Sequence, residues 1–161
     1  MTPTAKAVIW RAVHQDFADE ILFAPEVLEH LRRHRQLDSF AKEAGGQLFG
    51  SRVGTGLHVI AASGPYKSDA RTRISYRSDP VAADRMISAM RKKGLIYLGE
   101  WHTHPERYPQ PSGSDIDAFA RLCAHSERAS ATLILAIQGQ AETTMGLTVL
   151  TLDENRLAPW A

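Results

Sequence analysis

The chain has 161 residues, of which 43% are hydrophobic and 23% are charged, a composition typical of one globular domain and not of a disordered chain. The formal net charge is +1 with histidine neutral, so the overall charge does not favour a nucleic-acid partner. The single cysteine excludes an intrachain disulfide and fits a reducing cytoplasm, and no apolar run is long enough for a signal peptide or a membrane span. We expect one cytoplasmic domain over residues 1–161 that binds neither nucleic acid nor a membrane.

The N-terminal half predicts strands around one helix. A first strand is expected over 7–13, and a helix is expected to begin near Pro25, since proline is tolerated at the first helical position. Further along, strands over 45–50 and 57–62 are joined by a glycine-containing hairpin turn. The segment 66–78 is polar and predicts a surface loop with a short edge strand.

The C-terminal half alternates helices and strands. Asp79-Pro80 is typical of a helix start, and Gly94 is expected to end that helix. The apolar run 95–99 predicts a strand buried on both faces, and a third helix is expected to follow a cap at Ser112 or Ser114. The last two strands are expected over 132–137 and 147–152. The predicted class is mixed α/β (α+β), with about six strands and three flanking helices.

Two histidines separated by one residue follow the apolar strand. The segment reads His102-Thr103-His104-Pro105, and Asp115 comes eleven residues after the second histidine. Side chains two apart in an extended segment point to the same side, and the proline-stiffened loop can return Asp115 to the same point. Two imidazoles and one carboxylate are three of the four ligands of a catalytic zinc, whose fourth position takes water. We predict one Zn²⁺ per chain, held by His102, His104 and Asp115.

A lone His-x-His also has an ordinary explanation, as two surface histidines or a strand-end pair hydrogen-bonded to backbone. Its place after a buried strand and before a Ser-x-x-Asp segment favours the metal site. The other five histidines have no such neighbours and are expected on the surface or with satisfied partners in the core: His14, His30, His34, His58 and His125.

A zinc-activated water requires a general base, and two glutamates are candidates. Glu43 precedes Gly46 and Gly50 at the start of an expected strand. Glu100 lies two residues before His102 and shares its side-chain parity. Spacing does not choose between them, because a glutamate so close to a metal-binding histidine could instead orient that histidine.

Together these segments resemble the JAMM metalloprotease family, also called MPN+ or JAB. The family pattern is a glutamate followed by glycines three and seven residues later, then His-Ser/Thr-His-Pro, then Ser-x-x-Asp. All three parts are present in order, as Glu43 to Gly50, His102 to Pro105 and Ser112 to Asp115. The resemblance covers roughly residues 40–150, and it implies a single-domain MPN/JAB fold.

The resemblance also implies a role for each matching residue. It assigns zinc binding to His102, His104 and Asp115. It assigns general-base and then general-acid catalysis to Glu43, which leaves Glu100 as a supporting residue. Ser112 is implied to stabilise the tetrahedral oxyanion, a role that suits a preorganised hydroxyl donor.

The family further implies a protein substrate, because its enzymes cleave amide or isopeptide bonds after the C-terminal tail of ubiquitin or a ubiquitin-like protein. The compact size and the segment 99–102 resemble the stand-alone bacterial branch. Members of that branch lie beside E1- and E2-like proteins in anti-phage operons. They remove a ubiquitin-like protein, or a nucleotidyltransferase of a cyclic-oligonucleotide (CBASS) system, from its conjugates. We expect this activity here, with the C-terminal tail of such a protein as substrate and E1- and E2-like proteins as possible partners.

Other interpretations remain open at this stage. The same enzyme could act on a sulfur-carrier protein in cofactor biosynthesis, or the chain could be a non-catalytic MPN-type scaffold, although a scaffold is expected to have lost its ligands. A PHP-type phosphoesterase also uses His-x-His, but it needs further metal-binding clusters downstream. As a hypothesis, the segment 66–78 forms one wall of the substrate groove, where Arg71, Arg73 and Arg77 could meet an acidic partner.

Overall fold

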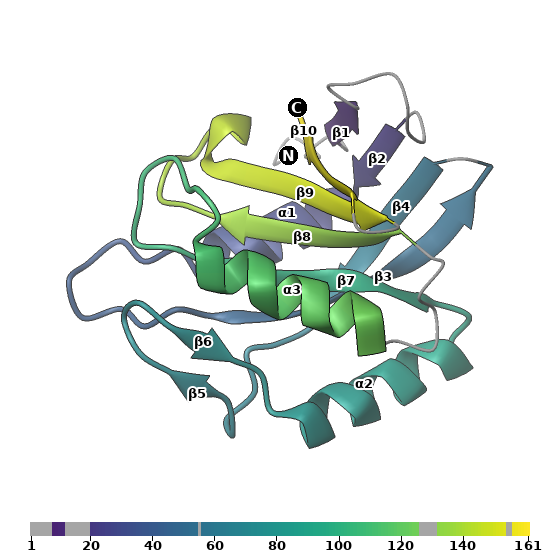
Figure 1. Cartoon of the computed structure of the whole chain (residues 1–161), viewed down its shortest axis with the longest axis horizontal. Coiled ribbons are helices and arrows are strands. Elements are labelled where there is room, and N and C mark those ends of the chain that lie inside the picture. Colours follow the sequence, from purple (N-terminus) through teal and green to yellow (C-terminus); the bar gives the residue numbers. More distant parts are fainter. Residues whose placement is uncertain (1–7, 12–19, 55, 126–131, 154–155) are drawn as a thin grey trace, which may run out of the picture.

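The computed structural model describes residues 8–11, 20–54, 56–125, 132–153 and 156–161 (Figure 1). Their elements follow the chain as β1 (Val8–Arg11), β2 (Glu20–Phe23), α1 (Pro25–Arg33), β3 (Gly45–Val53), β4 (Gly56–Ala62), β5 (Ala70–Arg71), β6 (Tyr76–Arg77), α2 (Pro80–Lys92), β7 (Ile96–Thr103), α3 (Gly113–His125), β8 (Leu133–Gln138), the 3₁₀ turn η1 (Thr144–Gly146), β9 (Leu147–Asp153) and β10 (Arg156–Trp160).

Eight of the described strands form one mixed sheet in the order β1-β2-β4-β3-β7-β8-β9-β10. The β2–β4 and β7–β8 pairs are parallel, and the other neighbours are antiparallel. The expected mixed class is confirmed, but the sheet is larger than the six strands expected. The strands β2 and β10 were missed because they have four and five residues, too few for a clear alternation pattern.

Helices cover both faces of the sheet, with α3 crossing the near face in Figure 1 and α1 lying behind it. The side chains of β8 show that both faces are covered, because successive side chains of a strand face opposite sides of the sheet. Ile134 and Ala136 belong to the core cluster that includes α1, whereas Leu133, Leu135 and Ile137 pack with Phe119 of α3. The centre of the sheet is therefore buried on both faces, as expected for the apolar run of β7.

The two motif glycines of β3 are required by close backbone packing. A Cβ at Gly46 would lie 1.8 Å from the carbonyl oxygen of Ser63, and a Cβ at Gly50 would lie 1.7 Å from that of His58. Both distances are far below van der Waals contact. The glycines let neighbouring backbone approach β3, which fixes the position of the segment that begins with Glu43.

Helix starts follow the predicted signals. Helix α1 begins at Pro25, and Asp79 caps α2 by accepting a hydrogen bond from the Val81 amide at 3.0 Å. The expectation of an edge strand within 66–78 is wrong, because β5 and β6 pair with each other as a separate hairpin. Of the strand expected over 7–13, only Val8–Arg11 lies among the described residues. No helix within the described ranges has the length and apolar character needed to cross a membrane.

Candidate metal centre

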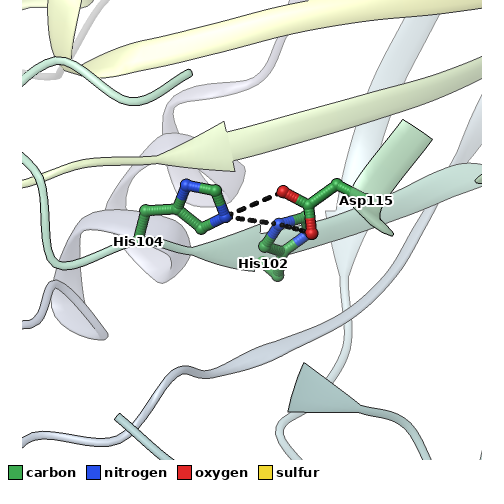
Figure 2. A group of neighbouring side chains, drawn as sticks. All are labelled: His102, His104 and Asp115. Atoms are coloured by element: carbon green, nitrogen blue, oxygen red, sulfur yellow. Dashed lines mark hydrogen bonds and ion pairs between the residues drawn. The ribbon is translucent and has the colours of Figure 1, made fainter. Parts of the chain in front are cut away.

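The end of β7 and the first turn of α3 bring three predicted ligands together (Figure 2). The Nε2 atoms of His102 and His104 lie 3.1 Å apart. One carboxylate oxygen of Asp115 lies 3.3 Å from His102 Nε2, and the other lies 3.0 Å from His104 Nε2. Both histidines are buried and Asp115 is partly buried. The i, i+2 spacing thus places both imidazoles on one side of the strand, as predicted.

These distances fit a divalent ion bound between the three side chains. Tetrahedral coordination with bonds of about 2.0–2.1 Å places neighbouring donor atoms about 3.3 Å apart, close to the 3.0–3.3 Å separations observed. Among the described residues, this trio alone forms a group of three or more such side chains whose potential ligand atoms converge, all within 4.8 Å. The residues could therefore hold a metal ion without rearrangement.

Ser112 and Asp115 fix each other at the start of α3. The Ser112 hydroxyl accepts a hydrogen bond from the Asp115 amide at 3.1 Å, and Asp115 Oδ2 accepts one from the Ser112 amide at 2.9 Å. This reciprocal pair is a capping box with aspartate at its third helical position. The Ser-x-x-Asp spacing therefore orients the carboxylate through local helix geometry. The Ser112 hydroxyl also lies 3.0 Å from that of Ser114 and lines a cavity beside His104.

The two histidines favour the ionised form of the Asp115 carboxylate. Burial alone would raise the pKa of Asp115, but hydrogen bonds from His102 and His104 outweigh this effect and hold the pKa well below its ordinary value. For His104, burial acts to lower the pKa, but Asp115, Glu43 and Glu106 together raise it above its ordinary value. The partly buried carboxylate therefore favours positive charge between the two imidazoles, as a bound cation would supply.

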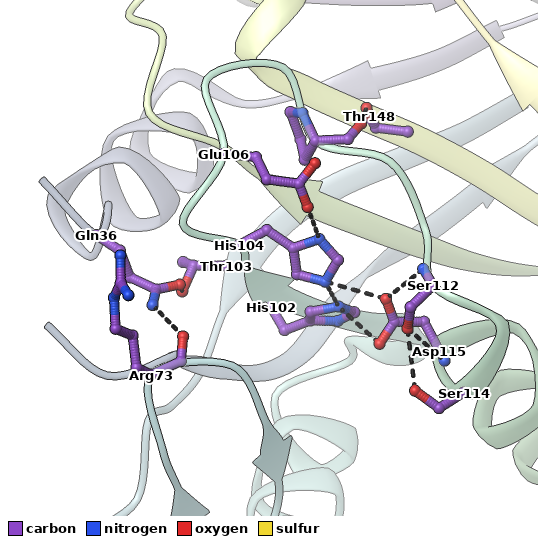
Figure 3. A network of polar contacts seen from close by, with 11 residues as sticks. Gln36, Arg73, His102, Thr103, His104, Glu106, Ser112, Ser114, Asp115 and Thr148 are labelled. Carbon is purple, nitrogen blue, oxygen red and sulfur yellow. Dashed lines mark hydrogen bonds and ion pairs between the residues drawn. The ribbon is translucent and has the colours of Figure 1, made fainter. Parts of the chain in front are cut away.

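A supporting contact between Glu106 and His104 was not predicted (Figure 3). Glu106 Oε1 lies 3.1 Å from His104 Nδ1. A proton on Nδ1 donated to this carboxylate leaves Nε2 with its lone pair facing the site, the usual arrangement for a metal-binding histidine. The sequence does place Glu106 two residues after His104. Because this part of the chain is a loop, however, the direction of the Glu106 side chain could not be predicted from the spacing.

Thr103 points away from the site, as expected, and ties three segments together. Its Oγ1 accepts a hydrogen bond from the Ala44 amide at 2.9 Å and donates one to Gln36 Oε1 at 2.9 Å. The Gln36 amide donates to the carbonyls of Ala41 and Arg73. Thr103 and Gln36 are both fully buried. This junction holds the segment before β3 in register with the end of β7.

Glu43 lies immediately before β3 and lines the same cavities as the three converging side chains. It is 4% exposed. Burial raises the pKa of its carboxyl to about 7, with His104 lowering it and Asp115 and Glu106 raising it. A carboxylate with a pKa near neutrality can accept and return a proton under physiological conditions. The position is compatible with a general base.

Glu100 lies on the same side of β7 as His102, but its carboxylate already accepts hydrogen bonds from neighbouring side chains. Its two oxygens accept hydrogen bonds from the Tyr97 hydroxyl at 2.8 Å and the Gln47 amide at 2.9 Å. Burial raises its pKa to about 7 against the effect of both hydrogen bonds. Among the described contacts, no hydrogen bond engages the Glu43 carboxylate in this way. Glu43 therefore remains the proposed proton acceptor, the role that the resemblance implies for it.

The segment 66–78 forms a wall of the site. Tyr76 and Ser78 line one cavity with His102 and Asp115, and Ile74 to Tyr76 line the other cavity with His104. Arg71 has a different position from the one hypothesised, since its Nε donates to the backbone carbonyl of Glu43 at 2.6 Å. It anchors the segment that carries Glu43, while Arg73 and Arg77 are exposed.

Other candidate residues behave as ordinary structural groups. Cys123 is partly buried beside the α3 cluster, and burial raises the pKa of its thiol to about 11, so it is not an activated nucleophile. His30 Nε2 lies 2.8 Å from the Gly64 carbonyl oxygen, which is the satisfied contact expected for it. His14 lies outside the described residues, as does the side chain of His125.

Comparisons with known proteins agree with this arrangement. The chain is 30% identical over 134 residues to a CD-NTase/cGAS isopeptidase of Escherichia coli (strain TW11681), covering 81% of this chain and 83% of that protein. It is 36% identical over 118 residues to a CD-NTase/cGAS isopeptidase of Pseudomonas aeruginosa (strain BWHPSA011 / Pa011), covering 71% and 75%.

A solved structure and a family model complete the comparison. The solution structure of a protein from Desulfitobacterium hafniense matches with a TM-score of 0.58 at 22% identity, covering 85% of this chain and 87% of that one, and so shares the fold. The model of prokaryotic homologues of the JAB domain matches residues 24–150, the region that contains Glu43, the two histidines and Asp115. The chain therefore belongs to the prokaryotic JAB-domain family.

Proposed function

We propose that the chain is a zinc-dependent isopeptidase that releases a CD-NTase-type nucleotidyltransferase, or a ubiquitin-like protein, from conjugates formed through its C-terminal tail. The observation that carries this proposal is the convergence of His102, His104 and Asp115 beside the Glu43 carboxylate. A scaffold without activity has no need for an intact set of converging ligands and a free carboxylate.

Each side chain has a distinct task in the proposed hydrolysis. His102, His104 and Asp115 would hold Zn²⁺, which supplies Lewis acidity and lowers the pKa of a water ligand towards about 7. Glu43 accepts a proton from the attacking water and returns it to the leaving amine nitrogen. The Ser112 hydroxyl donates a hydrogen bond to the oxyanion that develops on the scissile carbonyl.

The substrate class comes from the relatives, which are named CD-NTase/cGAS isopeptidases. An extended C-terminal tail suits a site bordered by a hairpin, because β6 can offer main-chain groups to it. Removing a nucleotidyltransferase from its conjugates is consistent with an anti-phage role next to E1- and E2-like proteins, the setting implied by the family resemblance.

The test is cleavage of a defined conjugate. The chain is loaded with one equivalent of Zn²⁺ and incubated with a CD-NTase joined through its C-terminus to a lysine side chain of a carrier protein. We expect release of the intact nucleotidyltransferase, loss of activity after chelation, and recovery with Zn²⁺. The Glu43→Gln variant is the matched control, since it keeps the metal-binding residues. Release that persists in fully chelated protein would refute the proposal.

The hairpin wall is tested separately. Arg73→Ala combined with Arg77→Ala should raise KM for the conjugate if these exposed cations contact an acidic substrate surface. Arg71 is left intact in this variant because it holds the Glu43 backbone. Unchanged kinetics would remove arginine contacts from the description of the groove while leaving the catalytic proposal intact.

A further inference from the structure

A second feature of the site has no task in the hydrolysis described above. A cavity of about 200 Å³ lies beside the proposed metal centre. One side of it is formed by α3 and the other by β7 and β8. Its walls are mainly apolar, and the apolar side chains on this face of the sheet are Ala118, Phe119, Leu122 and Leu135. The cavity is continuous with the catalytic side chains, because Glu43, His102 and Asp115 also line it.

The polar part of this cavity contains a fixed carboxylate. Glu100 lines the cavity, and its oxygens are held by the Tyr97 hydroxyl and the Gln47 amide at 2.8 and 2.9 Å. The Gln47 side chain is itself fixed, since its Oε1 accepts a hydrogen bond from the Tyr66 hydroxyl at 2.5 Å. All of these donors are neutral. They orient the carboxylate without supplying a counter-charge.

No Lys, Arg or His among the described residues forms an ion pair with Glu100, although the described ion pairs do include other carboxylates. The Glu100 side chain is half-buried, and a carboxylate that is partly withdrawn from water gains from pairing with a cation. Its neutral donors occupy one lone-pair position on each oxygen, so each oxygen can accept a further hydrogen bond. The open lone-pair positions of Glu100 therefore suit a cationic group that enters along the apolar walls.

We propose, on the basis of the proposed isopeptidase function, that this cavity is a specificity pocket for a basic side chain of the substrate residue next to the scissile bond. The apolar walls contact the methylene stem of a lysine, and Glu100 accepts hydrogen bonds from its ammonium group. A carboxylate within a pocket beside a catalytic centre is a known way for a protease to select basic residues. A lysine stem suits such walls because it is apolar along its length.

The first test measures binding without catalysis. Zinc-loaded, ¹⁵N-labelled full chain is titrated with Nα-acetyl-lysine methylamide or with Nα-acetyl-norleucine methylamide, which has an apolar side chain without the ammonium group. The backbone amides of Phe119 and Leu122, two residues of the cavity wall, report on binding. We expect the lysine compound to bind about tenfold or more tightly, the effect of a charge-assisted hydrogen bond. Equal affinities would overturn the proposal.

The Glu100→Gln variant identifies the group responsible. It keeps the shape of the side chain but removes its charge, so the preference for lysine over norleucine should fall to about twofold or less. Ala118→Phe is a second variant that fills the cavity from an exposed position of α3 and should abolish the response of the cavity-wall amides to both compounds. A lysine preference that survives Glu100→Gln would assign Glu100 to a purely local role and overturn the pocket.

Cleavage separates this pocket from the catalytic proposal. Internally quenched tail peptides carry lysine, norleucine or glutamine at either residue flanking the scissile bond. We expect kcat/KM to be about tenfold higher for lysine at one of the two positions, and this ratio to fall in Glu100→Gln. The Asp84→Asn variant, at an exposed acid of α2, should keep the wild-type ratio. Equal cleavage of all the peptides would overturn the pocket and leave the isopeptidase intact.

Discussion

Thr103→Val tests whether the buried junction behind the site holds it together. Valine has almost the same shape as threonine but lacks the hydroxyl. The change removes the acceptor of the Ala44 amide and the donor to Gln36 Oε1, both at 2.9 Å. Ala44 is 1% exposed and Gln36 is 0% exposed, so water cannot readily replace the lost partner of either group.

The expected loss follows from these two unsatisfied groups. Each buried polar group without a partner costs about 1–3 kcal/mol. Part of this cost is offset because the threonine hydroxyl no longer has to be buried. We expect the free energy of unfolding to fall by about 2–4 kcal/mol, which lowers the melting temperature of a domain of this size by roughly 4–16 °C. Thr103→Ser keeps the hydroxyl and loses one buried methyl group, at a cost of about 1 kcal/mol.

Chemical denaturation of both variants, in the same metal state as the wild type, measures the difference. Thr103→Val should be less stable than Thr103→Ser by at least about 1 kcal/mol, well above the error of such a comparison. Because Ala44 follows Glu43 in the chain, kcat should also fall further in the valine variant. Equal stabilities of the valine and serine variants would show that the hydrogen bonds of Thr103 contribute little, and the reasoning would be refuted.

Four further predictions concern the chemistry. Glu43→Gln should lower kcat by about 10²–10⁴-fold while a metal assay still finds one zinc per chain; normal activity would instead identify Glu100 as the base. Asp115→Ala should lose both metal and activity. Chelation of the wild type should leave it folded but less stable by about 4 kcal/mol relative to protein at a Zn²⁺ concentration 1,000 times Kd; an unchanged melting temperature would exclude a tightly bound ion. Burial raises the pKa of Glu43 to about 7 and a base acts when deprotonated, so kcat/KM should fall as the pH decreases. A bound cation favours the carboxylate, so the midpoint should lie below 7, and this acidic limb should be altered in Glu43→Gln.

The sequence alone determined the features that depend on short-range geometry. His102 and His104 share one side of β7 because side chains alternate along a strand. Asp115 was expected in the first turn of the third helix, after a cap at Ser112 or Ser114, and it lies there. The starts of α1 and α2 followed from proline and aspartate at their expected positions. These features are local, so a pattern of a few residues was sufficient to predict them.

Other features depended on segments that meet only in the folded chain. The short strands β2 and β10 are held by neighbours distant in sequence, and their own residues carry too weak a pattern to predict them. Spacing did not choose between Glu43 and Glu100, and only the folded chain shows that Tyr97 and Gln47 hold the Glu100 carboxylate. Arg71 likewise looked free to meet a substrate, yet it donates to the Glu43 backbone. Side-chain partners across the sheet are set by tertiary packing, and spacing along one chain contains no record of them.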